Sequence, residues 1–314
     1  MNWKKYAALG MCFALLFVSG CGSDKKQENN TKVFATITDA TNKTVTFSKQ
    51  PKRMVPLSAS LLPMIDAIGG EIVGRTASKV GTIPESMKNV PEVGLVYNVN
   101  TEALVGLKPD LVFAATNQHA KIVSLLESNN IKVLQLNPKT YNDVKNTMQI
   151  LGTIYNKKDK ANEVCNKLDK DIENVKAKLP KEKHRVVIMF ATARNVTVQG
   201  ASSIAGCVSD ILGLENIAAK IAKGDKTPYS MEALLEGNPE HIFVTTMGKK
   251  EEIENRLKKD FKDNPAWNSL DAVKNNRVHV LPEDLFLLNP GLKYPEAVKY
   301  MANLIYPEAL KDAK

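Results

Sequence analysis

Side chains that could carry out chemistry are scattered along this sequence and form no familiar catalytic motif. The motifs GxSxG, HExxH, GxxxxGK and GxGxxG are all absent, although they mark common nucleophile, metal and phosphate sites. The segment 199–206 is rich in glycine and serine but lacks the spacing of a nucleophile elbow. A bare zinc or manganese site needs histidines and carboxylates that converge on one point, and the chain has only four histidines, far apart. We therefore expect neither catalytic residues nor a cofactor of the protein's own.

The cysteines also argue against a metal centre. There are four, Cys12, Cys21, Cys165 and Cys207, and no CxxC pair is present. This spacing supports neither a structural zinc site nor a disulfide framework. Because the first two belong to an N-terminal segment treated below, only Cys165 and Cys207 concern the folded part, where we expect buried free thiols.

The elements that would position a site occur twice. Residues 101–113 match residues 231–243 with glutamate, alanine, leucine, proline and phenylalanine in register. Each copy predicts a short helix, a stop marked by proline and an apolar strand. The apolar runs at 53–57 and 185–190 likewise begin each half and precede a polar loop and a helical pattern. Two α/β lobes of similar build with parallel-rich sheets are therefore predicted.

The same organisation predicts where a ligand would bind. In sheets of parallel strands, ligands bind beyond the carboxyl ends of the strands. The loops nominated by this rule are 58–60, 116–119, 191–195 and 245–248.

A single long helix is predicted between the halves. Apolar residues recur at three-and-four spacing from Ala161 to Leu179, and Pro180 ends the run. A helix of about 22 residues would be roughly 33 Å long at 1.5 Å per residue. Since a helical connector is stiffer than a flexible hinge, we expect limited closure of the lobes. The predicted parts are a signal peptide at 1–20, a tether at 21–31, an N-terminal lobe at 32–156, an interlobe helix at 157–180 and a C-terminal lobe at 181–314.

The N-terminus has the pattern of an export signal. Lys4 and Lys5 precede an apolar run that ends at Val18, and its length of about 13 residues is too short for the roughly 20 that span a bilayer. Ser19 and Gly20 before Cys21 resemble a bacterial lipobox, which implies acylation of Cys21 and anchoring at the outer face of the cell membrane. The polar residues 22–31 predict a flexible tether.

The charge of the chain excludes one class of partner. Removing residues 1–20 lowers the formal charge of +9 by two lysines, to +7. Lysines alternate with acidic residues, as at 157–160 and 249–252, and no basic stripe with interleaved aromatic residues occurs. We therefore expect no nucleic-acid partner. A basic surface suits an anionic ligand or anionic lipid headgroups equally well.

Together these segments resemble the bacterial ABC-transporter substrate-binding lipoproteins for ferric siderophores, haem and cobalamin, in which two Rossmann-like lobes are joined by one long helix. The resemblance extends almost from end to end. The matching segments are Ile37–Val45, Pro51–Val55, Glu102–Asp110, Gly213–Ile217, Asn275–Val280 and Asn289–Gly291.

The resemblance implies partners as well as a fold. It implies a monomer that delivers its ligand to an ABC permease with its ATPase. In the family one acidic residue on each lobe meets arginines of the permease, and the matching positions here are Glu102 and Glu232. Each also stands in the first turn of a predicted helix, where the helix dipole alone favours an acid.

The resemblance further implies a set of ligand-binding residues. Tyr97 follows Pro91–Gly94 at a place where haem-binding members carry an iron ligand, and Met247 and His119 follow the repeated strands. All three residue types are axial ligands of haem iron, and Tyr97 and Met247 would contact the metal if the ligand is haem. Hydroxyl, cationic and apolar partners of the ligand are expected from Ser58, Ser60, Arg75, Arg194, Tyr229 and Phe286.

Three alternatives remain open. Cobalamin relatives usually present several aromatic rings, whereas only 6% of these residues are aromatic, so haem or a ferric siderophore is preferred over cobalamin. An extracellular α/β enzyme is the alternative of a different class, and a structural or adhesive lipoprotein is a third.

Overall fold

The computed structural model describes residues 33–78, 83–116, 118–218, 227–258, 261 and 264–311. Residues Val33–Lys314 form one compact unit. The predicted signal peptide, the tether and Cys21 lie outside the described residues. Within the described ranges, no helix combines the length and apolar character needed to span a bilayer.

The N-terminal lobe is built around a parallel sheet of three strands. Its order is β3 (Met54–Pro56), β7 (Leu111–Ala115), β8 (Lys132–Leu136). Val112 and Phe113 of the middle strand are fully buried, as expected for a parallel strand that is covered on both faces. Two small sheets adjoin it: the antiparallel pair β1 (Ala35–Thr38) and β2 (Thr44–Phe47), and the set β4 (Arg75–Ala77), β5 (Glu92–Leu95) and β6 (Asn98–Val99).

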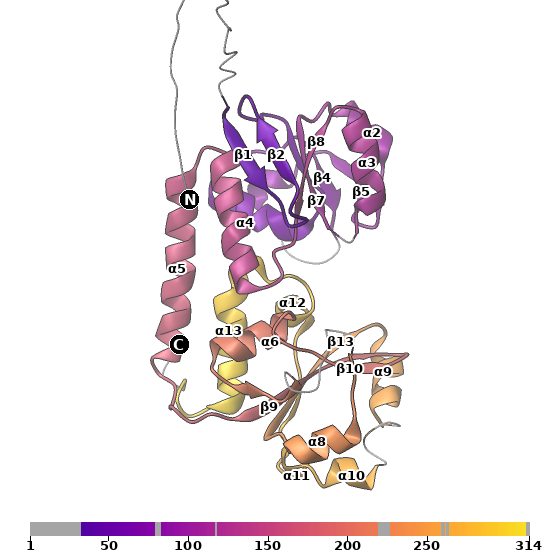
Figure 1. Cartoon of the computed structure of the whole chain (residues 1–314), viewed down its shortest axis with the longest axis vertical. Coiled ribbons are helices and arrows are strands. Elements are labelled where there is room, and N and C mark those ends of the chain that lie inside the picture. Colours follow the sequence, from indigo (N-terminus) through magenta and orange to yellow (C-terminus); the bar gives the residue numbers. More distant parts are fainter. Residues whose placement is uncertain are drawn as a thin grey trace, which may run out of the picture. The chain divides into compact units, whose positions relative to one another are not determined.

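Helices follow the strands of this lobe (Figure 1). They are α1 (Leu62–Ala67), α2 (Thr101–Gly106), α3 (Ala120–Ser128) and α4 (Tyr141–Ile154), with 3₁₀ turns η1 (Ala59–Leu61) and η2 (Glu85–Met87). The start of α4 is fixed by a capping box, in which Thr140 and Asp143 each bond the other's backbone N–H.

The C-terminal lobe has a mixed sheet of order β12-β10-β9-β13-β14, and β11 also pairs with β9. The central strands β9, β13 and β14 are parallel, whereas β10 pairs antiparallel with both of its neighbours, β9 and β12. The bounds are β9 (Arg185–Thr192), β10 (Val196–Val198), β11 (Glu215–Asn216), β12 (Thr227–Pro228), β13 (His241–Met247) and β14 (Val278–Val280).

The helices of the C-terminal lobe are short except for the last. Their bounds are α6 (Ile204–Ile211), α8 (Met231–Gly237), α9 (Lys250–Leu257), α10 (Pro265–Asn268), α11 (Asp271–Lys274), α12 (Glu283–Phe286) and α13 (Tyr294–Ile305), with a 3₁₀ turn η4 (Gly291–Lys293). Helix α13 buries Tyr294 and Met301 completely.

The predicted repeat is confirmed in its structure. The first copy forms α2 followed by β7, and the second forms α8 followed by β13. Leu104 and Leu234 occupy equivalent, fully buried positions, as do Phe113 and Phe243. The fold therefore consists of two lobes of similar build, each with a parallel-rich sheet, as predicted.

The predicted long helix is α5 (Lys158–Lys176), which lies against α4 of the first lobe and α13 of the second (Figure 1). It ends earlier than the periodicity predicts because residues 177–179 form a turn before Pro180, and the residue before a proline is disfavoured in helical geometry. On this helix Asp169 accepts hydrogen bonds from the Tyr141 hydroxyl at 2.8 Å and the Lys145 ammonium at 2.7 Å.

A second connection accompanies α5. The Tyr294 hydroxyl of α13 donates to the Lys139 carbonyl at 2.7 Å, and the rings of Tyr141 and Tyr294 are 5.4 Å apart. Cys165 is buried, as expected, whereas Cys207 is only partly buried. These contacts of α13 add a packing connection beside α5, the single long helix through which the chain passes from one lobe to the other, and they agree with the expectation of limited closure.

Three of the four histidines form one cluster in the C-terminal lobe. His241 and His279 share a hydrogen bond between Nδ1 and Nε2 at 3.2 Å, and the His184 ring lies edge-on to His241. His184 also pairs with Glu240 at 2.7 Å. Burial, followed by the positive charges of His279, Arg277 and His184, lowers the pKa of His241 to about 4, against a small rise from Glu240.

We expect this cluster to make the folded state sensitive to acid. A histidine with a folded-state pKa below its unfolded value of 6.5 contributes stability above pH 6.5, which is lost as the pH falls through about 4. For His241 the loss corresponds to about 2 to 3 kcal/mol. In urea unfolding at pH 7, 5.5 and 4, His241→Phe should lose distinctly less stability than the wild type over this range. Equal losses in the two proteins would contradict the assignment.

Candidate functional site

The loops that the sequence nominates lie at the carboxyl ends of parallel strands. Loop 58–60 follows β3, loop 116–119 follows β7, and segments 191–195 and 245–248 include the ends of β9 and β13. The structure therefore places candidate residues of both lobes at the strand ends where ligands bind in sheets of this type.

Tyr97 lies at the tip of a tight hairpin formed by β5 and β6. Leu95 pairs with Asn98, so that Val96 and Tyr97 form a turn of two residues. The Tyr97 side chain is 82% exposed and makes no hydrogen bond to any residue that the structure describes. Its phenol oxygen is therefore available to an incoming ligand.

Gly94 makes this turn possible. Its φ is +93°, a backbone conformation that residues with a side chain rarely adopt. A Cβ atom at this position would lie 2.6 Å from the Asn98 carbonyl oxygen and 2.8 Å from the Asn100 nitrogen.

We expect Gly94→Ala to displace the hairpin and to weaken any binding through Tyr97. The strained φ and the backbone clash should cost about 1 to 3 kcal/mol of stability. Gly106→Ala is the matched control because a Cβ atom at Gly106 would have no neighbour within 4 Å and its φ is ordinary. Chemical denaturation of both variants would measure the difference, and equal stability would show that the hairpin tolerates a side chain.

Met247 ends β13 and is 53% exposed. It precedes Gly248, which has a φ of +129° and so turns the chain sharply after the strand. Tyr97 and Met247 share no hydrogen bond or ring contact in the described parts of the chain. They are two exposed candidate ligands at the strand ends of different lobes.

His119 is differently placed from Tyr97 and Met247. It is 3% exposed, and burial lowers its pKa. Its Nδ1 accepts a hydrogen bond from the Ala115 N–H at 2.9 Å, and its Nε2 lies 2.8 Å from the Val96 carbonyl oxygen. With both ring nitrogens occupied, His119 has no lone pair for iron, and we leave it out of the proposed ligand set.

Arg75 is also engaged within the protein. Its guanidinium is buried and bonds the backbone carbonyls of Thr76, Met87 and Lys88 and the carboxylate of Glu92. This network anchors β4 and β5, so Arg75 supports the hairpin instead of offering a free cation. We leave it out of the proposed set for the same reason as His119.

Of the remaining candidates, four are at least partly exposed and one is buried in the core. Ser58 and Ser60 are half-buried and their hydroxyls are 2.9 Å apart, and Arg194 is exposed in the turn between β9 and β10. Tyr229 packs on Phe261 with ring centroids 5.2 Å apart and is half-buried. Phe286, by contrast, is 3% exposed and packs against Tyr300, so it belongs to the core and cannot line an open site.

Glu102 and Glu232 occupy equivalent positions on the two lobes. Each lies exposed in the first turn of a capped helix, where the side chains of Asn100 and Ser230 accept from the N–H groups of Ala103 and Ala233. Neither carboxylate forms an ion pair with another described residue. Both acids are therefore free to meet a cationic partner.

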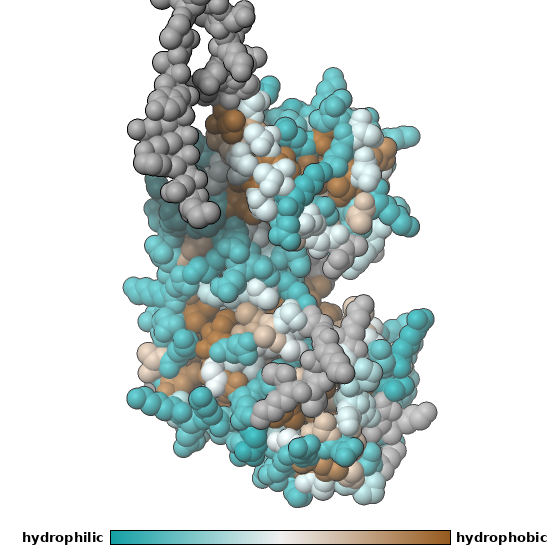
Figure 2. Space-filling model, in the orientation of Figure 1, coloured by the Kyte–Doolittle hydropathy of each residue, from teal (hydrophilic) through white to brown (hydrophobic). Residues whose placement is uncertain are grey.

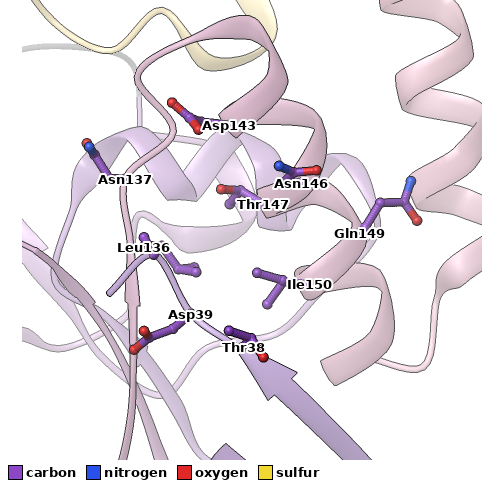
Figure 3. A pocket seen from close by; sticks show the side chains of 10 residues that line it. Thr38, Asp39, Leu136, Asn137, Asp143, Asn146, Thr147, Gln149 and Ile150 are labelled. Atoms are coloured by element: carbon purple, nitrogen blue, oxygen red, sulfur yellow. The ribbon is translucent and has the colours of Figure 1, made fainter. Parts of the chain in front are cut away.

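A hollow of about 360 Å³ lies in the N-terminal lobe, between the ends of β1 and β8 and one face of α4 (Figure 3). Its carboxylates are already used by the fold. Asp39 accepts four hydrogen bonds from Thr41, Lys43 and Gln135, and Asp143 belongs to the capping box. We therefore do not assign a ligand to this hollow.

On the face drawn in Figure 2, the described surface is mainly hydrophilic with smaller apolar areas. Leu95 is an exposed apolar residue beside the Tyr97 turn, and the sequence did not single it out. No local pattern predicts its exposure, because alternation along Glu92–Leu95 puts Val93 and Leu95 on the same face of the strand, yet only Val93 is buried. Leu95 therefore replaces Phe286 as the apolar candidate for a ligand contact. Across the described ranges, no group of three or more histidine, cysteine or acidic residues could hold a bare metal ion.

Comparison with known proteins defines the class. The sequence profile of the periplasmic binding protein family matches residues 55–285, and the chain belongs to this family. It is 28% identical to an uncharacterised ABC transporter substrate-binding lipoprotein of Bacillus subtilis, over 98% of this chain and all of the relative. Members are binding proteins of transport systems and act outside the cytoplasm, so the enzyme alternative is set aside.

Two further relatives are informative. The high-affinity haem uptake protein IsdE of Staphylococcus aureus is 29% identical over 82% of this chain and 88% of its own length. Its crystal structure with haem matches 81% of this chain and 98% of that structure, with a TM-score of 0.70. An ABC transporter substrate-binding protein from Listeria monocytogenes matches 83% of this chain and all of that structure, with a TM-score of 0.73 at 27% identity.

Proposed function

We propose that this protein captures an iron complex, preferably haem, between its two lobes and delivers it to an ABC permease and its ATPase. The observation that carries the proposal is the exposed phenol of Tyr97 on a hairpin that is held at its base by Arg75 and Glu92. A tyrosine oxygen is an established axial ligand of haem iron. Similarity to a haem uptake protein supports the same ligand.

The proposed ligand set contains residues from both lobes. Tyr97 and Met247 would contact the iron, and Leu95 would contact the apolar face of the macrocycle. Arg194, Ser58 and Ser60 would bind carboxylates, since a guanidinium forms paired hydrogen bonds with planar oxyanions. Because Tyr229 is only half-buried, its ring could contact the ligand from the C-terminal lobe.

A ferric siderophore is the second candidate. The hydroxyl pair of Ser58 and Ser60 and the exposed guanidinium of Arg194 suit the oxygen-rich surface of such a chelate. Cobalamin ranks third because few aromatic side chains lie on the candidate loops.

The proposal includes the site of action. Cys21 would carry the lipid anchor on the outer face of the membrane, and residues 21–31 would tether a monomeric binding domain. The lipobox pattern in the sequence supports this part, and the similar Bacillus protein is itself described as a lipoprotein.

Calorimetric titration with a panel of ligands tests the choice. Haemin, a ferric catecholate siderophore, a ferric hydroxycarboxylate siderophore and cyanocobalamin are titrated separately into the purified protein. We expect one saturable, equimolar interaction, with haemin. Tight binding of a siderophore alone would replace haem with the second candidate, and binding of none of the four would refute the proposed function.

A further inference from the structure

We propose that His119 is a positioning residue that holds Tyr97 in place for the ligand. This inference rests on the proposed function, because it assigns the role of a residue behind the same site. The ring does not contact the ligand. It acts through the backbone of the residue that precedes Tyr97.

The hydrogen bonds of the ring define its protonation state. A backbone N–H can only donate, so the bond from Ala115 makes Nδ1 the acceptor. A carbonyl can only accept, so Nε2 carries the hydrogen and donates to Val96 at 2.8 Å. His119 is therefore a neutral imidazole that joins two backbone groups through opposite ends of one rigid ring.

The two backbone groups that the His119 ring joins belong to parts of the lobe that differ strongly in rigidity. Ala115 ends β7, whose residues Leu111–Ala114 are fully buried. Val96 belongs to the turn of the hairpin, where only two residue pairs join β5 to β6. A hairpin of this size is marginal by itself. The imidazole thus connects the turn to the central strand of the lobe.

Other contacts hold the strands of the hairpin, and β4 pairs with β5 as far as Leu95, but no other hydrogen bond recorded for the described residues involves Val96 or Tyr97 of the turn. The Asn100 N–H donates to the Val93 carbonyl at 2.8 Å, and Arg75 pairs with Glu92. Tyr97 is 82% exposed and has no packing of its own that would fix the turn. Among the contacts recorded for the described residues, the His119 bond to Val96 is the one that reaches the turn itself and so limits movement of the phenol.

Two substitutions test the two hydrogen bonds of the His119 ring separately. His119→Asn can keep an acceptor for the Ala115 N–H but cannot reach Val96, whereas His119→Gln can place an amide N–H near the Nε2 position. We expect His119→Asn to accelerate amide hydrogen exchange in residues 94–100 by about tenfold, the effect of losing one buried hydrogen bond. His119→Gln should keep exchange there within about twofold of the wild type, so that the conservative variant rescues the hairpin.

Hydrogen exchange needs no ligand, so it decides the role of His119 even if the proposed ligand is wrong. Unchanged exchange in His119→Asn, or equal acceleration in both variants, would overturn the proposal. Should His119→Asn fail to fold, His119→Gln carries the test, because acceleration beyond about tenfold at residues 94–100 in that variant contradicts the inference.

Haemin titration supplies the functional readout. In the wild-type background His119→Asn should weaken haemin binding by about tenfold, and in a Tyr97→Ala background it should have no further effect. An equal loss in both backgrounds would show a general structural role and overturn the inference. Absence of haemin binding by the wild type would instead refute the proposed ligand, while the exchange result still stands.

Discussion

Reversing both Glu102 and Glu232 to arginine is expected to reduce uptake by cells to background while leaving ligand affinity within about twofold of the wild type. Each acid is exposed and free of ion pairs with other described residues. Arginines of a permease would meet like charges in the variant, and such juxtaposition across an interface costs several kcal/mol. Uptake of radiolabelled iron complex in cells, beside titration of the purified protein, separates the two effects.

The matched control is Glu236→Arg. This glutamate is also exposed on α8 but lies in the last turn of the helix, where a positive charge is favourable. Each reversal in the first turn should cost about 0.3 to 1 kcal/mol of stability through the helix dipole, too little to unfold the protein. Weakened ligand binding by the double variant, or loss of uptake in Glu236→Arg, would contradict the docking assignment.

Tyr97→Ala is expected to lower haem affinity by on the order of 100-fold, about 2.7 kcal/mol, because an axial oxygen is lost from the iron. Stability should be unchanged, since a side chain that is 82% exposed contributes little to the core. Tyr97→Phe is the sharper variant because it keeps the ring and removes only the oxygen. If the oxygen binds iron, the two variants lose similar affinity and both lose the absorption bands of tyrosinate coordination.

A different outcome would assign the ring another role. Retained affinity in Tyr97→Phe would show that the ring stacks on the ligand without contacting the metal. Retained affinity in both variants would remove Tyr97 from the site.

The sequence predicted the fold well because the fold depends on local patterns. The match of residues 101–113 with residues 231–243 predicted the α2–β7 and α8–β13 units, and three-and-four spacing predicted α5. The end of α5 was misplaced because hydrophobic periodicity continues to Leu179, whereas the helix ends at Lys176 and residues 177–179 form a turn.

Whether a side chain is free to contact a ligand could not be predicted from local patterns. The position of His119 after β7 was correctly anticipated, but its burial depends on Val96, 23 residues away in sequence. Phe286 was expected to offer an apolar contact to the ligand, yet it packs against Tyr300 of α13. Arg75 is held by carbonyls of residues 87 and 88. In each case tertiary contacts, which leave no local pattern, decide whether a side chain is free.

Visible absorption titration of residues 33–314 with haemin tests the central claim most directly, since Val33–Lys314 is a compact unit by itself. We predict a saturable shift of the Soret band at one haemin per chain, which needs on the order of 100-fold more protein in Tyr97→Phe and is weakened by Met247→Ala. A Soret band that remains that of free haemin at all protein concentrations, or an unchanged shift in both variants, would contradict it.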